Sequence, residues 1–486
     1  MRVAIVHYHL KRGGVTRVVE NTLGRLLERG VEVVVLAEEA SGLDARFASL
    51  VATVPELAYQ TGAERVAASD LERGLRDAAR NALGGDPDVW HVHNHHLAKN
   101  TSLTEVVSEM AIKRDRLLLH IHDFPEDGRA SNYQALRDDL GAGVDKNLRS
   151  RLYPVGERVL YGVLNGRDHQ ALLHAGIPAE RMRLLANPVK ATEPFSQSDP
   201  VPGLSYEELI LYPTRAIRRK NLGELLLWAA MAPEGRHFGC TLAPDNPQAR
   251  PIYDRWVACA QDWALPVSFE LGNRDDLSFP ELMGAANALV TTSVAEGFGL
   301  GFLEPWVFGR PLVGRNLPLI TKDFTQIGLA LNDLYDRVDV PLSWLDGLDL
   351  KAELETAVAK MYEQYSIDCT TDTLAATYAD LTRGDVVDFG RLTEEMQELV
   401  IQRVVKDPDC GSALNPSALP SSGWSEASVQ NRALAEREFS LDAYGDLLIG
   451  CYEELANATP DDPEWIEPSE VLNQFLAPAN FSFLRA

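Results

Sequence analysis

The 486-residue sequence has few cysteines and no long apolar run. No two of its five cysteines form a CxxC pair or a metal-binding spacing, so they predict free thiols in a reducing compartment. No apolar stretch approaches the roughly 20 residues that a transmembrane helix needs. The sequence also runs from its first residue into a strand-like segment, without an apolar signal. We therefore expect a soluble, cytoplasmic protein.

Positive charge is scarce in the second half of the chain. Residues 1–195 carry 25 Lys and Arg against 26 Asp and Glu, whereas residues 196–486 carry 21 against 45. Such an acidic surface excludes nucleic acid as an expected partner and argues against binding to an anionic membrane. The near-neutral first half leaves a membrane contact open for the N-terminal domain alone.

Two successive α/β series are present. Residues 2–8 form a β-rich run, apolar residues then recur at helical spacing up to Gly30, and residues 31–36 form a second run, which predicts a βαβ unit with a parallel sheet. A linker rich in Pro, Ser and acidic residues follows at about 191–203, and a second series opens at residue 209. We predict α/β domains at 1–195 and 196–445, and a C-terminal helix and tail at 446–486 that packs back on the first domain.

Residues 336–423 interrupt the second series. They contain 17 Asp and Glu against 7 Lys and Arg, and they lack a recognisable phosphate-binding turn. We interpret them as a helical insertion in the second domain. Three roles remain open for this insertion: a lid, an acceptor-binding element or a subunit contact. A subunit contact would make the protein a homo-oligomer.

Histidines gather at the ends of two predicted strands. Four lie within six positions at His91, His93, His95 and His96, and the strand at 117–122 ends in HIHD with His122. Alternation along a strand places His91, His93 and His95 on one side, so a metal site is geometrically possible there. No cysteine or carboxylate accompanies them, and we favour polar, ligand-facing strand ends over a metal.

The segment EGFGLGFLE, residues 296–304, follows a predicted buried strand at 288–293. Its three glycines leave backbone amides unshielded where a helix from about Leu300 to Val307 should begin, and such amides can face an anion. Glu296 and Glu304 stand on opposite sides of this turn and can touch two parts of one elongated ligand. A strand–turn–helix with two surface acids is the alternative.

A second group of charges follows the strand at 209–212. Arg215, Arg218, Arg219 and Lys220 are four cations at one βα turn, inside an otherwise acidic half. Ligands of open α/β sheets bind at the carboxyl ends of the strands, and Arg pairs well with phosphate. The cluster therefore favours polyphosphate binding over a solvated charge run.

These motifs together resemble family 4 of the retaining nucleotide-sugar glycosyltransferases. The resemblance runs in order through Gly13-Gly14, HIHD, Asn187-Pro188, TRAIRRKN, EGFGLGFLEPWVFGRP and the helical segment at 431–455. It implies the GT-B fold of two facing Rossmann-like domains, no metal and no cofactor. The sugar nucleotide is a co-substrate.

The resemblance also implies roles for individual residues. Arg215 and Lys220 would stabilise the diphosphate leaving group, and Glu296 would hold donor-sugar hydroxyls while Glu304 accepts hydrogen bonds from the ribose. His122 would line the sugar pocket near the reacting carbon. The implied catalytic set is His122, Arg215, Lys220 and Glu296. The implied donor-binding set is Gly13, Gly14, Arg215, Lys220, Glu296, Gly297, Phe298, Gly299, Leu300 and Glu304.

The chain departs from the family pattern at two places. The family commonly has a Gly-rich turn and an acid after the strand GRPLV, whereas this chain has Arg315-Asn316-Leu317-Pro318. HNHHLAKN is also distinctive, and we predict that His95, Lys99 and Asn100 help to bind a polar acceptor.

The implied function is retaining transfer of a hexosyl group to a small soluble polar acceptor. A sugar, a sugar acid or a sugar phosphate fits, as in the synthesis of compatible solutes or disaccharides. Transfer to a lipid-linked or polysaccharide acceptor at the membrane is one alternative. A non-catalytic protein that binds sugar nucleotides is another.

Overall fold

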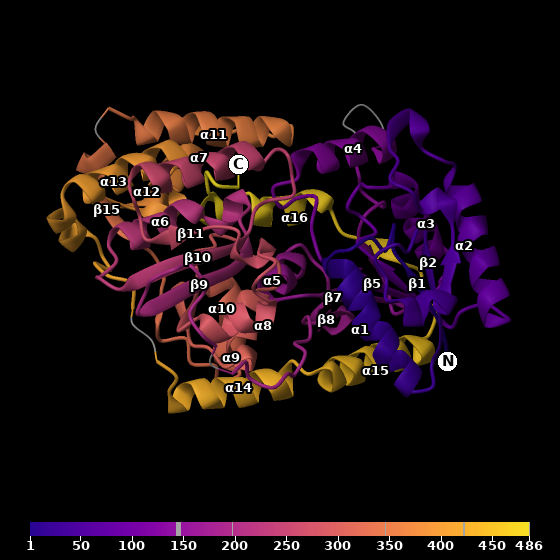
Figure 1. The fold of residues 1–486 in the computed structure, drawn as a ribbon. Coiled ribbons are helices and arrows are strands. Elements are labelled where there is room, and N and C mark those ends of the chain that lie inside the picture. Colours follow the sequence, from indigo (N-terminus) through magenta and orange to yellow (C-terminus); the bar gives the residue numbers. More distant parts are fainter. Residues whose placement is uncertain (142–146, 197, 346, 421–422, 486) are drawn as a thin grey trace. The chain divides into compact units, whose positions relative to one another are not determined.

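The computed structural model describes residues 1–141, 147–196, 198–345, 347–420 and 423–485, and the chain divides into two compact units (Figure 1). The first unit comprises Met1–Pro188, Glu363–Ile367 and Phe439–Ala477. The second comprises Val189–Tyr362, Asp368–Glu438 and Pro478–Ala486. Each unit therefore collects segments that are far apart in the sequence.

The first unit is built on a parallel sheet with the strand order β3-β2-β1-β4-β5-β7-β8. Its strands are β1 (Arg2–Val6), β2 (Glu32–Ala37), β3 (Val51–Thr53), β4 (Val89–His93), β5 (Leu117–Ile121), β7 (Val159–Val163) and β8 (Met182–Leu184). All five residues of β4, β5 and β7 are buried, as expected for central strands covered on both faces. The chain order changes direction between β1 and β4, which marks a ligand-binding edge.

Helices cover both faces of this sheet. They are α1 (Gly14–Glu28), α2 (Ala68–Leu83), α3 (Thr101–Ile112), α4 (Ala130–Leu140), α5 (Gly166–His174), α15 (Leu441–Asn457) and α16 (Pro468–Phe475). The late helix α15 packs against α1, β4 and β5 and contributes Leu448, Tyr452 and Leu455 to the core. A short antiparallel pair, β6 (Pro154–Val155) with β18 (Glu464–Trp465), holds the tail to the same unit.

The second unit repeats the design with the strand order β11-β10-β9-β12-β13-β14. Its strands are β9 (Glu208–Arg215), β10 (Arg236–Leu242), β11 (Val267–Ser268), β12 (Ala288–Thr291), β13 (Leu312–Arg315) and β14 (Leu334–Tyr335), all parallel. The accompanying helices are α6 (Leu222–Ala230), α7 (Arg250–Asp262), α8 (Phe279–Ala285), α9 (Glu304–Phe308), α10 (Pro318–Gln326) and α14 (Glu426–Glu438). Strand order reverses between β9 and β12, so the ligand edge lies there.

The insertion is mostly helical but also contains a small sheet. Its helices are α11 (Leu350–Gln364), α12 (Thr371–Leu381) and α13 (Glu394–Lys406). Three strands that the sequence pattern did not predict, β15 (Asp339–Pro341), β16 (Thr382–Arg383) and β17 (Val386–Asp388), form an antiparallel sheet in the order β15-β17-β16. They are only two or three residues long, too short to show an alternating pattern. Helix α13 packs on α6, which joins the insertion to the second sheet.

A buried cluster of charges fastens the insertion to that sheet. Arg315, at the end of β13, donates from Nε at 2.9 Å and from Nη2 at 2.6 Å to Glu224 of α6, and from Nη1 and Nη2 to Asp388 of β17, both at 2.8 Å. The three side chains are at most 7% exposed. Tyr335 donates a further hydrogen bond to Glu224 at 2.7 Å. Arg315, which breaks the family pattern, is therefore a structural residue here.

We expect Arg315→Met to destabilise the second unit strongly. It would leave the carboxylates of Glu224 and Asp388 buried without their cation, and removing one member of a buried ion cluster costs about 3–5 kcal/mol. Arg250→Met is the control, because the Arg250–Asp254 pair is about half exposed and such pairs contribute about 0–1 kcal/mol. Urea unfolding of both variants measures the difference, and equal losses would contradict a fastening role for Arg315.

Candidate active site

The ligand edge of the second unit forms where β9 and β12 end side by side. Beyond their paired residues the two chains stay joined, because Thr292 Oγ1 donates to Lys220 O at 2.9 Å and Val294 N donates to Arg219 O at 3.0 Å. Tyr212 of β9 and Ser293 share a hydrogen bond of 2.7 Å between their hydroxyls. The basic turn after β9 and the EGFG segment after β12 are therefore held against each other.

This edge brings Lys220 and Glu296 into an ion pair. Lys220 Nζ lies 2.5 Å from Glu296 Oε1, and the side chains are 17% and 13% exposed. Lys220 belongs to the short 3₁₀ helix η5 (Arg218–Lys220), and Glu296 lies in the loop after β12. The pair places one cation and one hydrogen-bond acceptor next to each other at the edge where α/β proteins bind ligands.

The other cations of the basic turn have different partners. Arg218 makes two hydrogen bonds to Glu394 at the start of α13, at 2.5 and 2.9 Å, so it supports the insertion. Arg215 pairs with Asp245, and these side chains are 43% and 83% exposed. An exposed pair of this kind contributes little, so Arg215 can exchange Asp245 for a ligand anion at small cost.

The glycines of the EGFGLGF turn fall into two classes. Gly299 has φ +98°, and a Cβ there would lie 2.8 Å from the Ile320 side chain, so the fold itself requires this glycine. Gly297 and Gly301 have open space where a Cβ would lie. The protein's own packing does not require them, whereas close approach of a ligand to the backbone would.

The helix predicted from Leu300 to Val307 is divided in two. A 3₁₀ turn, η7 (Leu300–Phe302), precedes α9, which begins at Glu304 and has Pro305 in its first turn. Proline fits a first helical turn but cannot donate within a helix, which explains the break. Phe298 is buried and packs edge-on against Phe324, so its side chain supports the turn from behind.

In the first unit, Gly13 and Gly14 lie at the start of α1. Gly13 is the N-cap residue in an extended conformation, and no side chain caps the helix there. A Cβ on Gly14 would meet nothing within 4 Å, and one on Gly13 only Lys11 O at 3.8 Å. A ligand can therefore approach the N-terminal amides of the 15-residue helix α1. This helix end lies at the edge where the strand order of the first sheet changes direction, between β1 and β4.

His122 lies directly after β5 and is 8% exposed. Its Nε2 lies 2.8 Å from Nδ1 of His93, the last residue of β4, and its main-chain N–H donates to Asn94 Oδ1 at 2.8 Å. Burial, with the nearby His120 and His7, holds the pKa of His122 well below its usual value, so the ring is neutral at pH 7. The two contacts therefore fix a neutral imidazole near the edge where the strand order of the first sheet changes direction.

Two of the three predicted acceptor residues have structural roles instead. His95 is fully buried with its Nε2 2.9 Å from Leu152 O. Asn100 is also fully buried, caps α3 through Leu103 N and donates to the carbonyls of Glu56 and Ala58. Only Lys99 is partly exposed, and its Nζ lies 5.6 Å from the centre of the Tyr59 ring.

The sequence reading overlooked Arg12 and Arg17 on the two sides of Gly13-Gly14. Both side chains are exposed, and neither makes an ion pair with the part of the chain that the structure describes. Their neighbour Lys11 pairs with Glu39 at 2.5 Å. The signal was available as KRGGVTR, three cations around a Gly-Gly turn in a chain with net charge −25.

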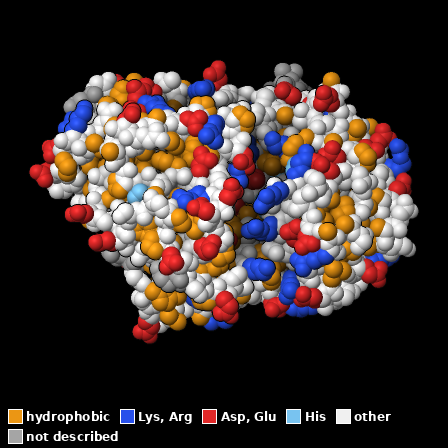
Figure 2. Space-filling model, in the orientation of Figure 1, with side chains coloured by type: hydrophobic (Ala, Val, Ile, Leu, Met, Phe, Trp, Pro, Cys, Tyr) orange, Lys and Arg blue, Asp and Glu red, His pale blue; other side chains and the backbone are white. Residues whose placement is uncertain are grey.

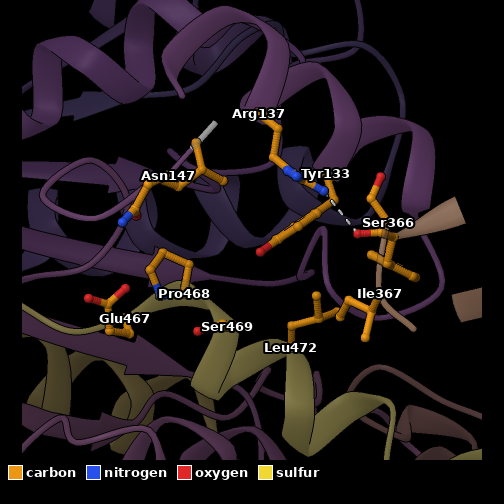
Figure 3. A pocket seen from close by; sticks show the side chains of 11 residues that line it. Tyr133, Arg137, Asn147, Ser366, Ile367, Glu467, Pro468, Ser469 and Leu472 are labelled. Carbon is orange, nitrogen blue, oxygen red and sulfur yellow. Dashed lines mark hydrogen bonds between the residues drawn. The ribbon is translucent and has the colours of Figure 1, made fainter. Parts of the chain in front are cut away.

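A separate cavity of about 280 Å³ lies between α4 and α16 in the first unit (Figure 3). Tyr133 and Arg137 line it from α4, Leu472 from α16, and Tyr365 and Ile367 from the segment at 363–367. Arg137 is already used there, because its Nη1 donates to Tyr365 O at 3.1 Å. The turn before α1 therefore offers better cations for an anionic ligand than this cavity does.

The face drawn in Figure 2 carries acidic and basic side chains interspersed with apolar ones. Within the described ranges, no helix is long and apolar enough to cross a membrane.

Comparison with known proteins identifies the class. The family model described as Glycosyltransferase Family 4 matches residues 12–193. Mannosylglucosyl-3-phosphoglycerate synthase of Petrotoga mobilis is 27% identical over 424 residues, which cover 81% of this chain and 79% of that protein.

Solved structures agree on the fold. HepE of Anabaena in complex with UDP and glucose matches with a TM-score of 0.51 at 15% identity, covering 93% of this chain and 98% of that one. A glycosyltransferase from Rickettsia africae matches with a TM-score of 0.54 at 12% identity, covering 94% and 99%. The two Rossmann-like units are those of the GT-B glycosyltransferases. The family match over residues 12–193 and the curated relative support a nucleotide-sugar-dependent glycosyltransferase of the family 4 type.

The loop that follows His122 contains a buried carboxyl group with a testable pH dependence. Glu126 is fully buried; its Oε1 accepts a hydrogen bond from Tyr153 at 3.0 Å, and its Oε2 has no partner among the described residues. Burial raises the pKa of Glu126 from 4.5 to about 8. Between these values the folded protein keeps a proton that the unfolded chain has lost, so this group lowers stability as pH rises.

We expect Glu126→Gln to be more stable than the natural protein at pH 8, because the amide mimics the protonated acid. The advantage should shrink toward pH 4.5, by up to about 1.4 kcal/mol per pH unit. Denaturant unfolding between pH 4.5 and 8 measures this trend. Glu64→Gln on an exposed turn is the control and should leave the pH dependence unchanged. A difference that grows toward acid pH would contradict the assignment.

Proposed function

We propose that the chain transfers a hexosyl group with retention from a nucleoside-diphosphate sugar to a small, soluble, anionic acceptor. The ion pair between Lys220 and Glu296, beside Arg215 at the ligand edge of the second sheet, is the observation that carries the donor half of this proposal. It supplies two cations for a diphosphate and one carboxylate for sugar hydroxyls.

Donor binding would exchange partners at this edge. Lys220 and Arg215 turn to the diphosphate, and the carboxylate of Glu296 accepts hydrogen bonds from hydroxyls of the donor sugar. The amides of Gly299 and Leu300 add donors, and the space beside Gly297 and Gly301 lets the phosphates reach the backbone. Glu304, at the start of α9, takes the ribose hydroxyls.

The cations then act on the charge that develops during the reaction. As the bond from the anomeric carbon to the diphosphate breaks, negative charge grows on the leaving phosphate oxygen, and Arg215 and Lys220 stabilise it without a metal ion. The acceptor hydroxyl attacks from the same face and its proton passes to that phosphate oxygen. His122, held neutral by its surroundings, carries no proton in this scheme.

The acceptor is proposed to bind at the turn before α1. Arg12 and Arg17 provide cations there, and the amide end of α1 favours an anion. Lys99 adds a third cation beside Tyr59, whose hydroxyl contacts His9 of the segment that leads to this turn. The name of the Petrotoga mobilis relative describes a product in which sugars are joined to 3-phosphoglycerate, an acceptor moiety with a phosphate and a carboxylate. An acceptor of this class fits the three cations, whereas His95 and Asn100 take no part.

A membrane-bound acceptor is the second candidate, since family membership alone does not choose between acceptors. It would require Arg12, Arg17 and Lys99 to contact an anionic lipid head group instead of a free anion.

The five cysteines are free, which supports the cytoplasmic placement.

We expect Lys220→Met and Glu296→Gln each to lower kcat by about 10²–10³-fold with the correct donor, because each removes a charge that contacts the reacting phosphate or sugar. A thermal-shift panel of nucleoside-diphosphate sugars first identifies that donor, since a ligand stabilises the folded protein by mass action. Release of nucleoside diphosphate then measures turnover.

Arg250→Met serves as the control for the donor site, because Arg250 and its partner Asp254 lie on α7 and are both about half exposed. It should keep full turnover. Retention of full turnover by Lys220→Met or Glu296→Gln would refute the donor assignment.

For the acceptor, we expect Arg12→Gln and Arg17→Gln to raise the acceptor KM by about tenfold or more each. A hydrogen bond to a charged group contributes about 1.5–3 kcal/mol, and donor binding in the other unit should stay unchanged. Arg29→Gln is the matched control, because Arg29 lies at the opposite end of α1 and pairs with Asp446. Unchanged acceptor KM in both variants would reject this turn as the acceptor site, and a loss seen only with anionic vesicles would favour the membrane alternative.

A further inference from the structure

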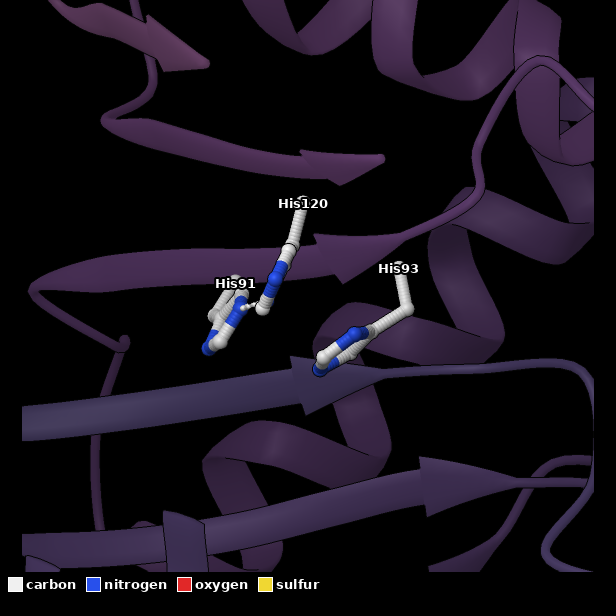
Figure 4. A group of neighbouring side chains, drawn as sticks. All are labelled: His91, His93 and His120. Atoms are coloured by element: carbon white, nitrogen blue, oxygen red, sulfur yellow. Dashed lines mark hydrogen bonds between the residues drawn. The ribbon is translucent and has the colours of Figure 1, made fainter. Parts of the chain in front are cut away.

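Three buried histidines at the centre of the first sheet have no assigned role in the transfer reaction. His91 and His93 lie on β4, and His120 lies on β5 opposite His93. All three are fully buried, and one ring nitrogen of each lies within 4.8 Å of the corresponding nitrogen of the other two. Figure 4 shows the His120 ring pointing toward His91, with the His93 ring beside them.

Two of these rings are oriented by outside partners. His91 Nδ1 lies 2.8 Å from the hydroxyl of Tyr452 on α15, and His93 Nδ1 lies 2.8 Å from Nε2 of His122. When Nδ1 of His91 and of His93 donates the hydrogen bond in these contacts, Nε2 of the same ring keeps a free lone pair. Metal-binding histidines in proteins are held in this way, with the second ring nitrogen bound to an outer partner that sets tautomer and orientation.

One inward nitrogen has no partner within the described part of the chain, and the other two form a hydrogen bond only with each other. His93 Nε2 is buried and has no hydrogen-bond partner within the described part of the chain. His91 Nε2 and His120 Nδ1 lie only 3.1 Å apart. Two nitrogens bound to one tetrahedral zinc ion, each at about 2.0–2.1 Å, lie about 3.3 Å apart, so this spacing fits a shared ion.

We propose that His91, His93 and His120 bind one Zn²⁺ ion in the core of the first unit. Imidazole nitrogens suit zinc, whereas Mg²⁺ and Ca²⁺ require oxygen ligands, and none of the three ligands is a carboxylate. The ion joins β4 to β5 beneath α15, and through His93 it fixes the ring of His122. Because all three rings are fully buried, the ion would have a structural role and would not contact a substrate.

The test is metal analysis of the full-length protein purified after expression with added Zn²⁺. We expect about one zinc ion per chain, and a melting temperature of chelator-treated protein that rises with Zn²⁺ but not with Mg²⁺. His93→Gln and His120→Gln should lose the zinc. His96→Gln is the matched control, because His96 is equally buried in the same unit but lies outside the cluster, and it should keep the metal.

A milder variant keeps the test valid if the histidine variants fail to fold. Tyr452→Phe removes only the hydroxyl beside His91 and should weaken zinc binding by about 10–100-fold. Cobalt-loaded natural protein should show the visible absorption of a tetrahedral site. Zinc-free natural protein with no Zn²⁺-dependent rise in melting temperature would overturn the proposal, as would equal zinc content in the natural protein and His93→Gln. Neither result would bear on the donor site, whose tests depend on turnover.

Discussion

The buried contact of Arg315 with Glu224 and Asp388 is the constraint on which the second unit depends. It ties the end of β13, the helix α6 that follows the basic turn, and the insertion into one body. Helix α6 starts directly after η5, which carries Lys220, and Arg218 of the same turn is bound to Glu394 of the insertion. Through these contacts the insertion supports the ligand edge of the second sheet, which is a structural role.

Whether a feature of the structure could be predicted depends on how close together in the sequence its contacting residues lie. The strand β12, the glycine turn and Glu296 follow one another in sequence, and the rule that ligands bind where strand order reverses brings the turn after β9 to the same edge. The pairing of Lys220 with Glu296 follows from these two facts. Arg315 could not be understood in this way, because its partner Asp388 lies 73 residues further on, in a strand of three residues.

The histidines show a second limit of sequence reasoning. Alternation predicts that His91 and His93 share a face, but it does not say whether that face stays open. Helix α15 returns from residue 441 to cover it, so these polar residues become core residues. His95 and Asn100 lie past the strand end, where alternation stops, and hydrogen bonds to the carbonyls of Leu152 and Glu56 turn them inward.

The ion pair at the ligand edge of the second sheet has a consequence for the selectivity of the proposed donor site. Lys220 and Glu296 are each less than a fifth exposed, so a ligand that takes only one of them leaves the other charge partly buried without a partner. A free sugar offers hydroxyls to Glu296 but no negative charge to Lys220, and a free diphosphate offers the charge but no sugar hydroxyls. A nucleoside-diphosphate sugar satisfies both at once. In the proposed donor complex the pair would therefore favour the intact donor over either of its parts.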